Sequence, residues 1–238
     1  MTLCLVTDRH QLAPEARTLR DQVLTLARWL DEAVAVGIDL IQLREGHLPA
    51  RLLCDLARTV AGAAKGSRTR VVVNDRADVA LAAGCDGVHL PGDAPSVARV
   101  RALERNVARA GLHARGRGPT GAEWCVGRSV HSVDDAVTHA DADYLLFGAV
   151  YDSGPKSGRG LAALRQTVSA CATSSVRVMA IGGVTVSRAA ECMAAGAAGV
   201  AAIRLFLPPG RATGAMGIAA GAHALRGAFD RAATGHLQ

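Results

Sequence analysis

The sequence predicts a TIM barrel, in which eight parallel strands alternate with eight helices around a closed sheet. Eight short, almost continuously apolar runs recur along the 238 residues, as expected for strands that are buried on both faces. Each run is followed by a longer stretch with helical periodicity. Half of the residues are hydrophobic but 3% are aromatic, so small aliphatic side chains must fill the core. The alternative is a doubly wound open sheet, but its glycine fingerprint is missing from the first turn, which reads TDRHQL.

Strands and helices alternate in order from the N-terminus. The expected strands cover 3–7, 38–44, 70–74, 87–90, 124–129, 143–148, 176–183 and 199–204. The expected helices cover 15–36, 49–64, 77–83, 95–109, 132–140, 160–172, 187–195 and 213–232. Ser132 and Ser187 are expected to cap helix starts, because a serine hydroxyl can accept from a free backbone N–H there. Gly37, Gly84 and Gly196 are placed to end helices in a left-handed conformation.

The barrel is expected to form a single domain over residues 1–238. Residues 111–122, GLHARGRGPTGA, contain four glycines and one proline, and they interrupt the alternation. They predict a flexible surface insertion between the fourth helix and the fifth strand. The tail at 234–238 is expected to be frayed.

Composition and charge exclude several classes of function. The formal net charge is +6 and the pI is near 9.4, but the arginines are dispersed and no aromatic platform for bases is present. We therefore expect phosphorylated small molecules rather than nucleic acid as partners. The six cysteines lack CxxC spacing, which argues against a zinc site or a redox dithiol. No signal peptide or membrane-length apolar run is present, so we expect a soluble cytoplasmic protein with no membrane partner.

Polar residues follow most of the expected strands. In a TIM barrel the residues at the C-terminal strand ends face a shared mouth, where chemistry takes place. His131, after the fifth strand in VGRSVHSVDD, is the candidate catalytic residue, and the alternative is an ordinary histidine at a strand-to-helix turn. The candidate substrate-binding residues are Gln42, Arg44, Asn74, Ser129 and Lys156.

The last two strand ends are typical of a phosphate site. Gly182 and Gly183 follow the seventh strand, and glycines let backbone N–H groups approach a phosphate. Ile203 and Arg204 end the eighth strand, where a short helix start would add a positive dipole end and Arg204 a charged contact. The alternative is that the two glycines form a tight turn and Arg204 is solvated.

Two aspartates are candidate magnesium ligands. Asp75 follows the third strand and Asp93 the fourth, but Mg²⁺ usually needs one or two carboxylates together with substrate phosphates. The alternative for Asp75 is a salt bridge to a neighbouring arginine. His89 lies between Val88 and Leu90 and is interpreted as a hydrogen-bonded structural residue.

The order of seven short motifs resembles the thiamine-phosphate synthase/TenI superfamily. These motifs are LVTDR, IQLRE, VNDRADVALAAGCDGVHLPGD, GRSVHS, DADYLLFGAVY, AIGG and AAGAAGVAA, and they span residues 3 to about 206. Each is weak alone, but seven in the right order with barrel spacing are specific. The resemblance implies one of two activities. The synthase joins a pyrimidine diphosphate to a thiazole phosphate with Mg²⁺, and the TenI branch is a thiazole tautomerase.

The tautomerase is the favoured interpretation at this point. The synthase pattern has a lysine where this chain has Gly46, and a second Mg²⁺ aspartate where it has Ala94. GRSVHS resembles TenI, in which the histidine at the position of His131 transfers the proton. A histidine with a pKa near 6.5 suits a proton shift between ring positions, Arg44 would hold the substrate carboxylate, and no metal is required.

Two alternatives remain open. Asn74 and Asp75 are retained as in the synthases, so a magnesium-dependent thiamine-phosphate synthase is the first. A barrel that binds thiazole phosphate without turnover, as a regulatory protein, is the second. Whether the chain forms a homo-oligomer is also left open.

Overall fold

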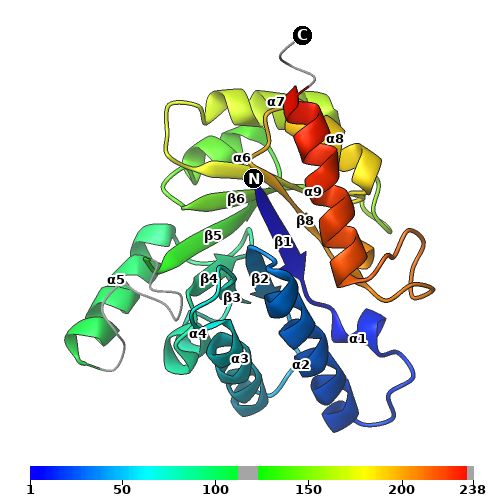
Figure 1. The fold of residues 1–238 in the computed structure, drawn as a ribbon. Helices are drawn as coiled ribbons and strands as arrows, with labels where there is room; N and C mark the ends of the chain where they lie inside the picture. The colour runs from blue at the N-terminus through cyan, green and yellow to red at the C-terminus, as the bar shows by residue number, and fades with distance from the viewer. Residues whose placement is uncertain (112–122, 235–238) are drawn as a thin grey trace. The chain divides into compact units, whose positions relative to one another are not determined.

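Eight parallel strands close into a barrel in the order of the chain (Figure 1). The computed structural model describes residues 1–111 and 123–234. The TIM-barrel prediction is therefore confirmed. The insertion expected at 111–122 lies outside the described residues except for Gly111, and the tail expected at 234–238 does so except for Thr234.

All eight expected strands are present, and their bounds differ from the prediction by at most two residues at either end. They are β1 (Thr2–Val6), β2 (Leu40–Leu43), β3 (Arg70–Asn74), β4 (Gly87–Leu90), β5 (Cys125–Val130), β6 (Tyr144–Gly148), β7 (Arg177–Ile181) and β8 (Gly199–Ala202). Most of their residues are buried on both faces, including all four of β2 and all five of β6. This explains why the strands read as continuous apolar runs rather than as alternating patterns.

The eight expected helices are also present, together with two short helical turns that were not predicted from the sequence. The helices are α2 (Leu19–Val36), α3 (Ala50–Ala64), α4 (Ala77–Ala83), α5 (Val97–Arg109), α6 (Val133–Thr138), α7 (Gly160–Ala170), α8 (Val186–Ala194) and α9 (Ile218–Thr234). The two unpredicted turns are α1 (Arg9–Leu12) and the 3-10 turn η1 (Arg204–Phe206). Both are too short to show helical periodicity.

Side-chain caps explain where several helices begin. Ser132 accepts from the N–H of Asp135 at 3.1 Å, which confirms its predicted role. The prediction for Ser187 was wrong, because Thr185 caps α8 by accepting from the N–H of Arg188 at 3.3 Å. Helix α2 begins at Leu19 rather than near residue 15, since Thr18 caps it. Capping hydroxyls therefore set these starts more sharply than hydrophobic periodicity does.

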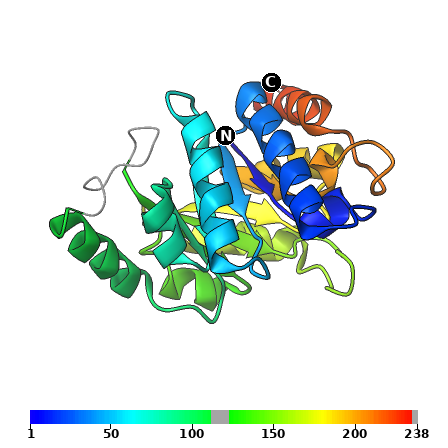
Figure 2. The same cartoon turned by 90° about the horizontal axis from the view of Figure 1, so that it is seen from below.

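The chain divides into two compact units, which are described separately below. The first unit contains residues 5–127, and the second contains residues 1–4 and 128–238. In the first unit α2, α3 and α4 lie side by side, as Figures 1 and 2 both show. In the second unit α7 packs on α6 and α8, and α8 packs on α9. Whether the barrel is one domain stays a prediction.

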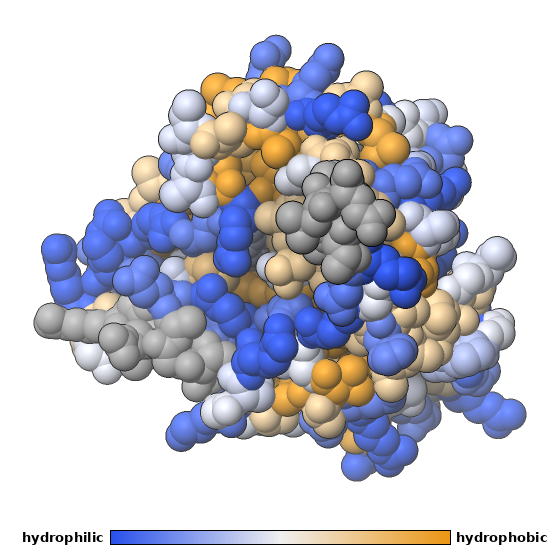
Figure 3. Space-filling view, turned by 45° about the horizontal axis from the view of Figure 1, so that its top comes forward, coloured by the Kyte–Doolittle hydropathy of each residue, from blue (hydrophilic) through white to orange (hydrophobic). Residues whose placement is uncertain are grey.

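The face that Figure 3 shows carries many hydrophilic residues, with groups of apolar residues between them. The exposed large hydrophobic residues lie at the chain start and on three helices, with two of them on α2: Met1, Leu19, Leu24, Leu103 and Val137. Single exposed apolar residues of this kind are ordinary in folded proteins. None of the helices in the described part of the chain combines the length and apolar character needed to cross a membrane. Cys4, Cys85 and Cys125 are buried, as expected for small core residues.

Candidate active site

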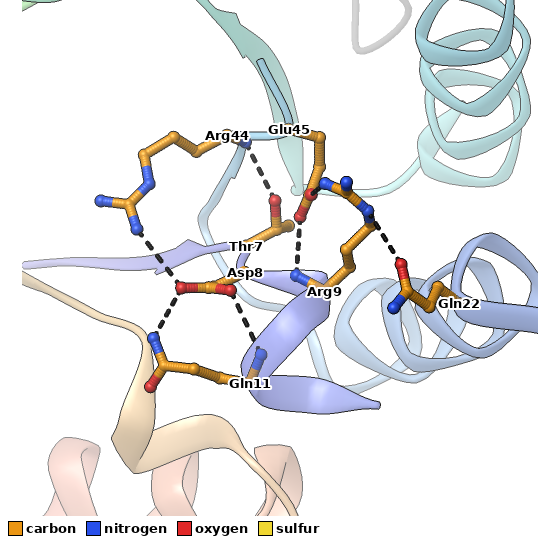
Figure 4. Close-up of polar contacts among 7 residues, drawn as sticks. All are labelled: Thr7, Asp8, Arg9, Gln11, Gln22, Arg44 and Glu45. Carbon is orange, nitrogen blue, oxygen red and sulfur yellow. Dashed lines mark hydrogen bonds and ion pairs between the residues drawn. The ribbon is translucent and has the colours of Figure 1, made fainter. Parts of the chain in front are cut away.

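Charged residues at the ends of β1 and β2 in the first unit are fixed by one another (Figure 4). The Arg9 guanidinium donates to the Glu45 carboxylate at 2.7 Å, and the Arg9 backbone N–H donates to the same carboxylate at 3.0 Å. Both side chains are buried, and Gln22 on α2 accepts a further hydrogen bond from Arg9 at 3.2 Å. The pair therefore joins Glu45, which follows Arg44, to Arg9, which follows Asp8.

Arg44 lies between these anchors with its guanidinium partly free. Its backbone N–H donates to the Thr7 hydroxyl at 2.9 Å, whereas its side chain is 41% exposed. Asp8 is 3.7 Å from the Arg44 guanidinium and also accepts from the N–H and the side-chain amide of Gln11 (Figure 4). The backbone of Arg44 is thus held firmly while its guanidinium remains able to contact an anion.

Gln42 lies in β2, two residues before Arg44, and is buried. Its Nε2 atom has no hydrogen-bond partner in the structure. A buried polar group without a partner costs roughly 1–3 kcal/mol, which a ligand acceptor would recover. This unpartnered amide supports the predicted substrate-binding role of Gln42.

Asp75 follows Asn74 at the end of β3, and its carboxylate makes no hydrogen bond or ion pair in the part of the chain that the structure describes. The salt bridge to a neighbouring arginine, considered above as the alternative, is not formed. Arg76 instead binds Asp78 through two hydrogen bonds of 2.8 and 2.6 Å. That bond holds the pKa of the Asp78 carboxyl below its usual value and raises the pKa of Arg76. Asp75 is left exposed and available to a ligand.

The backbone of Asp75 is unusual, because its φ is 65° in a residue that is not glycine. Its N–H donates to the carbonyl of the buried His89 at 2.8 Å, which fixes the turn. Asp93, after β4, is exposed. No group of three or more candidate ligands that could hold a metal ion by themselves is present in residues 1–111 and 123–234. Asp75 and Asp93 therefore remain predicted ligands for an ion that arrives with a phosphorylated substrate.

His131 follows β5 in the second unit and is held at both its backbone and its ring. Its N–H donates to the Asp135 carboxylate at 2.8 Å, and its Nδ1 lies 2.6 Å from the carbonyl oxygen of Gly148. A carbonyl can only accept, so Nδ1 carries a proton in this contact, and Nε2 makes no hydrogen bond with another described residue. Ser129 lies two residues earlier in β5 and is half-buried.

Gly182 and Gly183 form a left-handed turn after β7, with φ values of 97° and 64°. The turn leaves no room for side chains. A Cβ on Gly182 would lie 2.5 Å from the Ala149 Cβ, and one on Gly183 would lie 2.7 Å from the Asp152 carbonyl oxygen. The N–H groups of Gly183 and of the following Val184 donate to no group within the described chain. These free donors fit the predicted phosphate site.

The loop 149–159 after β6 carries the other predicted contacts. Lys156 is exposed and forms a backbone bridge with Ser153. Arg204 is exposed at the start of η1, and its guanidinium donates to the Ser153 hydroxyl at 2.9 Å. Ile203 is half-buried beside it. Arg204 is thus not simply solvated, because it binds Ser153. Its other guanidinium N–H groups can still donate to a ligand.

The sequence alone did not point to roles for Asp8, Tyr151 or Arg188. A contact of Asp8 with Arg44 could have been predicted, because TDR after β1 and RE after β2 place opposite charges at adjacent strand ends. Tyr151 and Arg188 interact across 37 residues of sequence, and no local pattern signals their contact.

Comparison with known proteins shows the family. The sequence model of the family described as thiamine monophosphate synthase matches residues 3–206. The chain belongs to this family. It is 37% identical over 189 residues to the thiamine-phosphate synthase of Methanoculleus marisnigri, covering 77% of this chain and 81% of the relative. It is 34% identical over 209 residues to that of Moorella thermoacetica, covering 84% and 86%.

A solved structure extends the likeness to three dimensions. The thiamine phosphate pyrophosphorylase from Pyrococcus furiosus superposes with a TM-score of 0.71 at 26% identity, covering 97% of this chain and 96% of that one. The superfamily resemblance is therefore confirmed. The favoured tautomerase interpretation was wrong, because the relatives are named as synthases, which are transferases and not isomerases. The motif GRSVHS outweighed the retained Asn74-Asp75 in that interpretation, although a histidine after β5 occurs in both branches.

Proposed function

We propose that this protein is a thiamine-phosphate synthase that joins a pyrimidine diphosphate to a thiazole phosphate and releases diphosphate. The observation that carries the proposal is the family match over residues 3–206, together with relatives named for this activity that match 77–84% of this chain. The exposed carboxylate of Asp75 supports it, because it makes no hydrogen bond or ion pair with another described residue. Both substrates are phosphorylated small molecules, which agrees with the excess of positive charge.

The reaction exchanges one bond for another. The bond between the pyrimidine methylene carbon and the diphosphate oxygen breaks, and the thiazole nitrogen uses its lone pair to form a new carbon–nitrogen bond. The electron pair of the broken bond leaves with diphosphate. No proton has to move, so the protein needs to orient the nitrogen and stabilise the leaving group rather than supply a base.

Cations stabilise the negative charge that develops on the leaving diphosphate. Arg44, with its partly exposed guanidinium, is the protein group of the first unit that we assign to its oxygens. Mg²⁺, when bound, would add positive charge at the same oxygens. Asp75 would hold the ion together with water and the diphosphate, and Asp93 is the second available carboxylate. Gly46 and Ala94 remove one cation and one carboxylate relative to the synthase pattern, so we expect weaker binding of diphosphate and metal than that pattern would give.

The second unit supplies contacts to the thiazole phosphate. We assign its phosphate to the free N–H groups after Gly182 and to Arg204. His131 no longer acts as a proton carrier in this reaction, and we assign its free Nε2 to a hydrogen bond with substrate. Gln42 and Asn74, in the first unit, remain candidate contacts to the pyrimidine.

The direct test incubates the purified full chain with both substrates and Mg²⁺ and measures thiamine phosphate by liquid chromatography and released diphosphate by a coupled assay. We expect equal amounts of the two products, and no product with EDTA or with either substrate omitted. Asp75→Asn should lower turnover at least a hundredfold, about 2.7 kcal/mol of barrier, whereas Asp93→Asn should have a smaller effect. Binding of both substrates without product would instead identify a non-catalytic binding protein.

A further inference from the structure

Arg188 joins the glycine turn to the loop after β6 in the second unit. It is the third residue of α8, and its guanidinium lies 4.5 Å from the centre of the Tyr151 ring. The same guanidinium donates to the carbonyl oxygen of Gly183 at 2.9 Å. One side chain thus connects a helix, a turn and a loop.

A positive charge in the first turn of a helix is unfavourable, because it meets the positive end of the helix dipole. Helix stability alone therefore does not explain an arginine at this position. The contact with the ring and the bond to Gly183 offset this cost. The charge instead adds to the positive potential of the turn.

Tyr151 is itself fixed, so that it offers Arg188 a rigid surface. Its hydroxyl donates to the Glu191 carboxylate at 2.7 Å, and its backbone N–H donates to the Gly182 carbonyl at 3.2 Å. Burial and this bond to Glu191 raise the pKa of Tyr151, so the hydroxyl remains a neutral donor. Burial also raises the pKa of the adjacent Cys192 thiol to about 11, which keeps a second negative charge away.

The bond to Gly183 determines where the next N–H points. In a trans peptide the carbonyl and the following N–H lie in one plane and point in opposite directions. Because Arg188 holds the carbonyl of Gly183, the N–H of Val184 is directed away from Arg188. This is one of the two donors that have no acceptor within the described chain.

We propose that Arg188 is a positioning residue that orients the peptide between Gly183 and Val184 so that its N–H can bind the phosphate of the substrate. The identity of that substrate as a thiazole phosphate rests on the proposed function. Arg188 acts through the peptide and through the Tyr151 ring, without entering the reaction.

The test compares Arg188→Met and Arg188→Lys with Arg165→Met, which removes the same charge from an exposed position on α7. Calorimetry would measure binding of thiazole phosphate, of the unphosphorylated thiazole alcohol and of inorganic phosphate. We expect Arg188→Met to weaken thiazole phosphate and inorganic phosphate about ten- to a hundredfold and to leave the alcohol unchanged. Arg188→Lys should recover part of the loss, and Arg165→Met should bind as the wild type does.

In turnover, Arg188→Met should raise the KM for thiazole phosphate by the same factor and change kcat less than threefold. Equal weakening of phosphate and alcohol, or normal phosphate binding by a folded variant, would overturn the proposal. If Arg188→Met does not fold, Arg188→Gln separates the hydrogen bond from the charge: because it can still donate to Gly183, it should keep most of the phosphate affinity, and a tenfold or greater loss would overturn the positioning role.

Failure of the proposed function would look different. A wild-type chain that makes no thiamine phosphate, but whose inorganic phosphate binding still depends on Arg188, would refute the synthase and support the positioning role.

Discussion

The strand ends of the two units are held in place by different means. After β1 and β2, in the first unit, charged side chains bind one another, with Arg9 on Glu45 and Arg44 beside Asp8. After β6 and β7, in the second unit, backbone groups and glycines do most of this work. There Gly182 and Gly183 pack on the loop 149–159, and Arg188 binds a carbonyl rather than a carboxylate.

This difference predicts two kinds of sensitivity. A buried ion pair contributes little net stability, but removing one partner leaves an uncompensated charge. The first unit should therefore respond strongly to loss of charge. In the second unit, loss of a charge should cost little folding stability, whereas added volume at the turn, which leaves no room for a Cβ, should disturb phosphate binding.

Glu45→Ala should lower the free energy of unfolding by about 3–5 kcal/mol, because it leaves the buried Arg9 guanidinium without its carboxylate. Urea denaturation measures this value. The control is the double variant Arg9→Met with Glu45→Gln, which removes both charges and keeps an oxygen for the Arg9 backbone N–H. It should lie within about 1 kcal/mol of the wild type or above it. If Glu45→Ala lowered the free energy of unfolding by less than about 1 kcal/mol, the first unit would not be especially sensitive to loss of charge.

Gly183→Ala should weaken thiazole phosphate binding about ten- to a hundredfold, or about 1.4–2.7 kcal/mol. The added Cβ would lie 2.7 Å from the Asp152 carbonyl oxygen and 2.8 Å from the Tyr151 Cβ, so the turn must shift. Calorimetry measures the affinity. Gly214→Ala is the matched control, because Gly214 has a φ of +76° with no atom within 4 Å of the position of a Cβ.

Both alanine variants carry the cost of a left-handed residue, about 1–2 kcal/mol. They should therefore lose similar stability, but Gly214→Ala should bind thiazole phosphate normally. The same loss of affinity in both variants would mean that left-handed strain, and not crowding at the turn, explains the effect.

The fold could be predicted closely from the sequence, because buried parallel strands leave continuous apolar runs that need no tertiary information. The phosphate turn could be anticipated for a related reason, since two adjacent glycines directly after a buried strand favour a turn whose backbone N–H groups are open to an anion. Helix starts were less predictable where two hydroxyls competed, as Thr185 and Ser187 do before α8.

The choice between the two activities could not be made from one motif. His131 suits proton transfer in isolation, but a histidine ring that donates to a carbonyl also suits a hydrogen-bond contact. The contact of Arg188 with Tyr151 was out of reach for a different reason. It depends on how a helix and a loop from separate repeats pack together, and local periodicity carries no information on that packing.

Asp8→Asn should have a modest effect, and it should strengthen substrate binding where the changes above weaken binding or stability. Asparagine caps helices as well as aspartate does, so α1 should remain, while Arg44 loses a partner 3.7 Å away. An exposed pair of this kind is worth up to about 1 kcal/mol. We expect the KM for the pyrimidine diphosphate to fall about two- to fivefold at low salt, because the Asp8 charge no longer competes for Arg44. The difference should shrink at high ionic strength. A higher KM would show that Asp8 aids binding by orienting Arg44.

The smallest effect concerns Asp78, which keeps Arg76 from pairing with Asp75. The hydrogen bond from Arg76 lowers the pKa of Asp78 from its ordinary 3.8, against an opposing contribution from burial. A lowered folded-state pKa means that the pair stabilises the protein above about pH 4 and that this stabilisation is lost as the pH falls further. Because both side chains are partly exposed, Asp78→Asn should cost less than about 1 kcal/mol at pH 7. Thermal unfolding should give the wild type a higher Tm than Asp78→Asn at about pH 7, and this difference in Tm should close toward about pH 3. A gap that persists at the lower pH would mean that Asp78 stabilises α4 by a contact that does not depend on its charge.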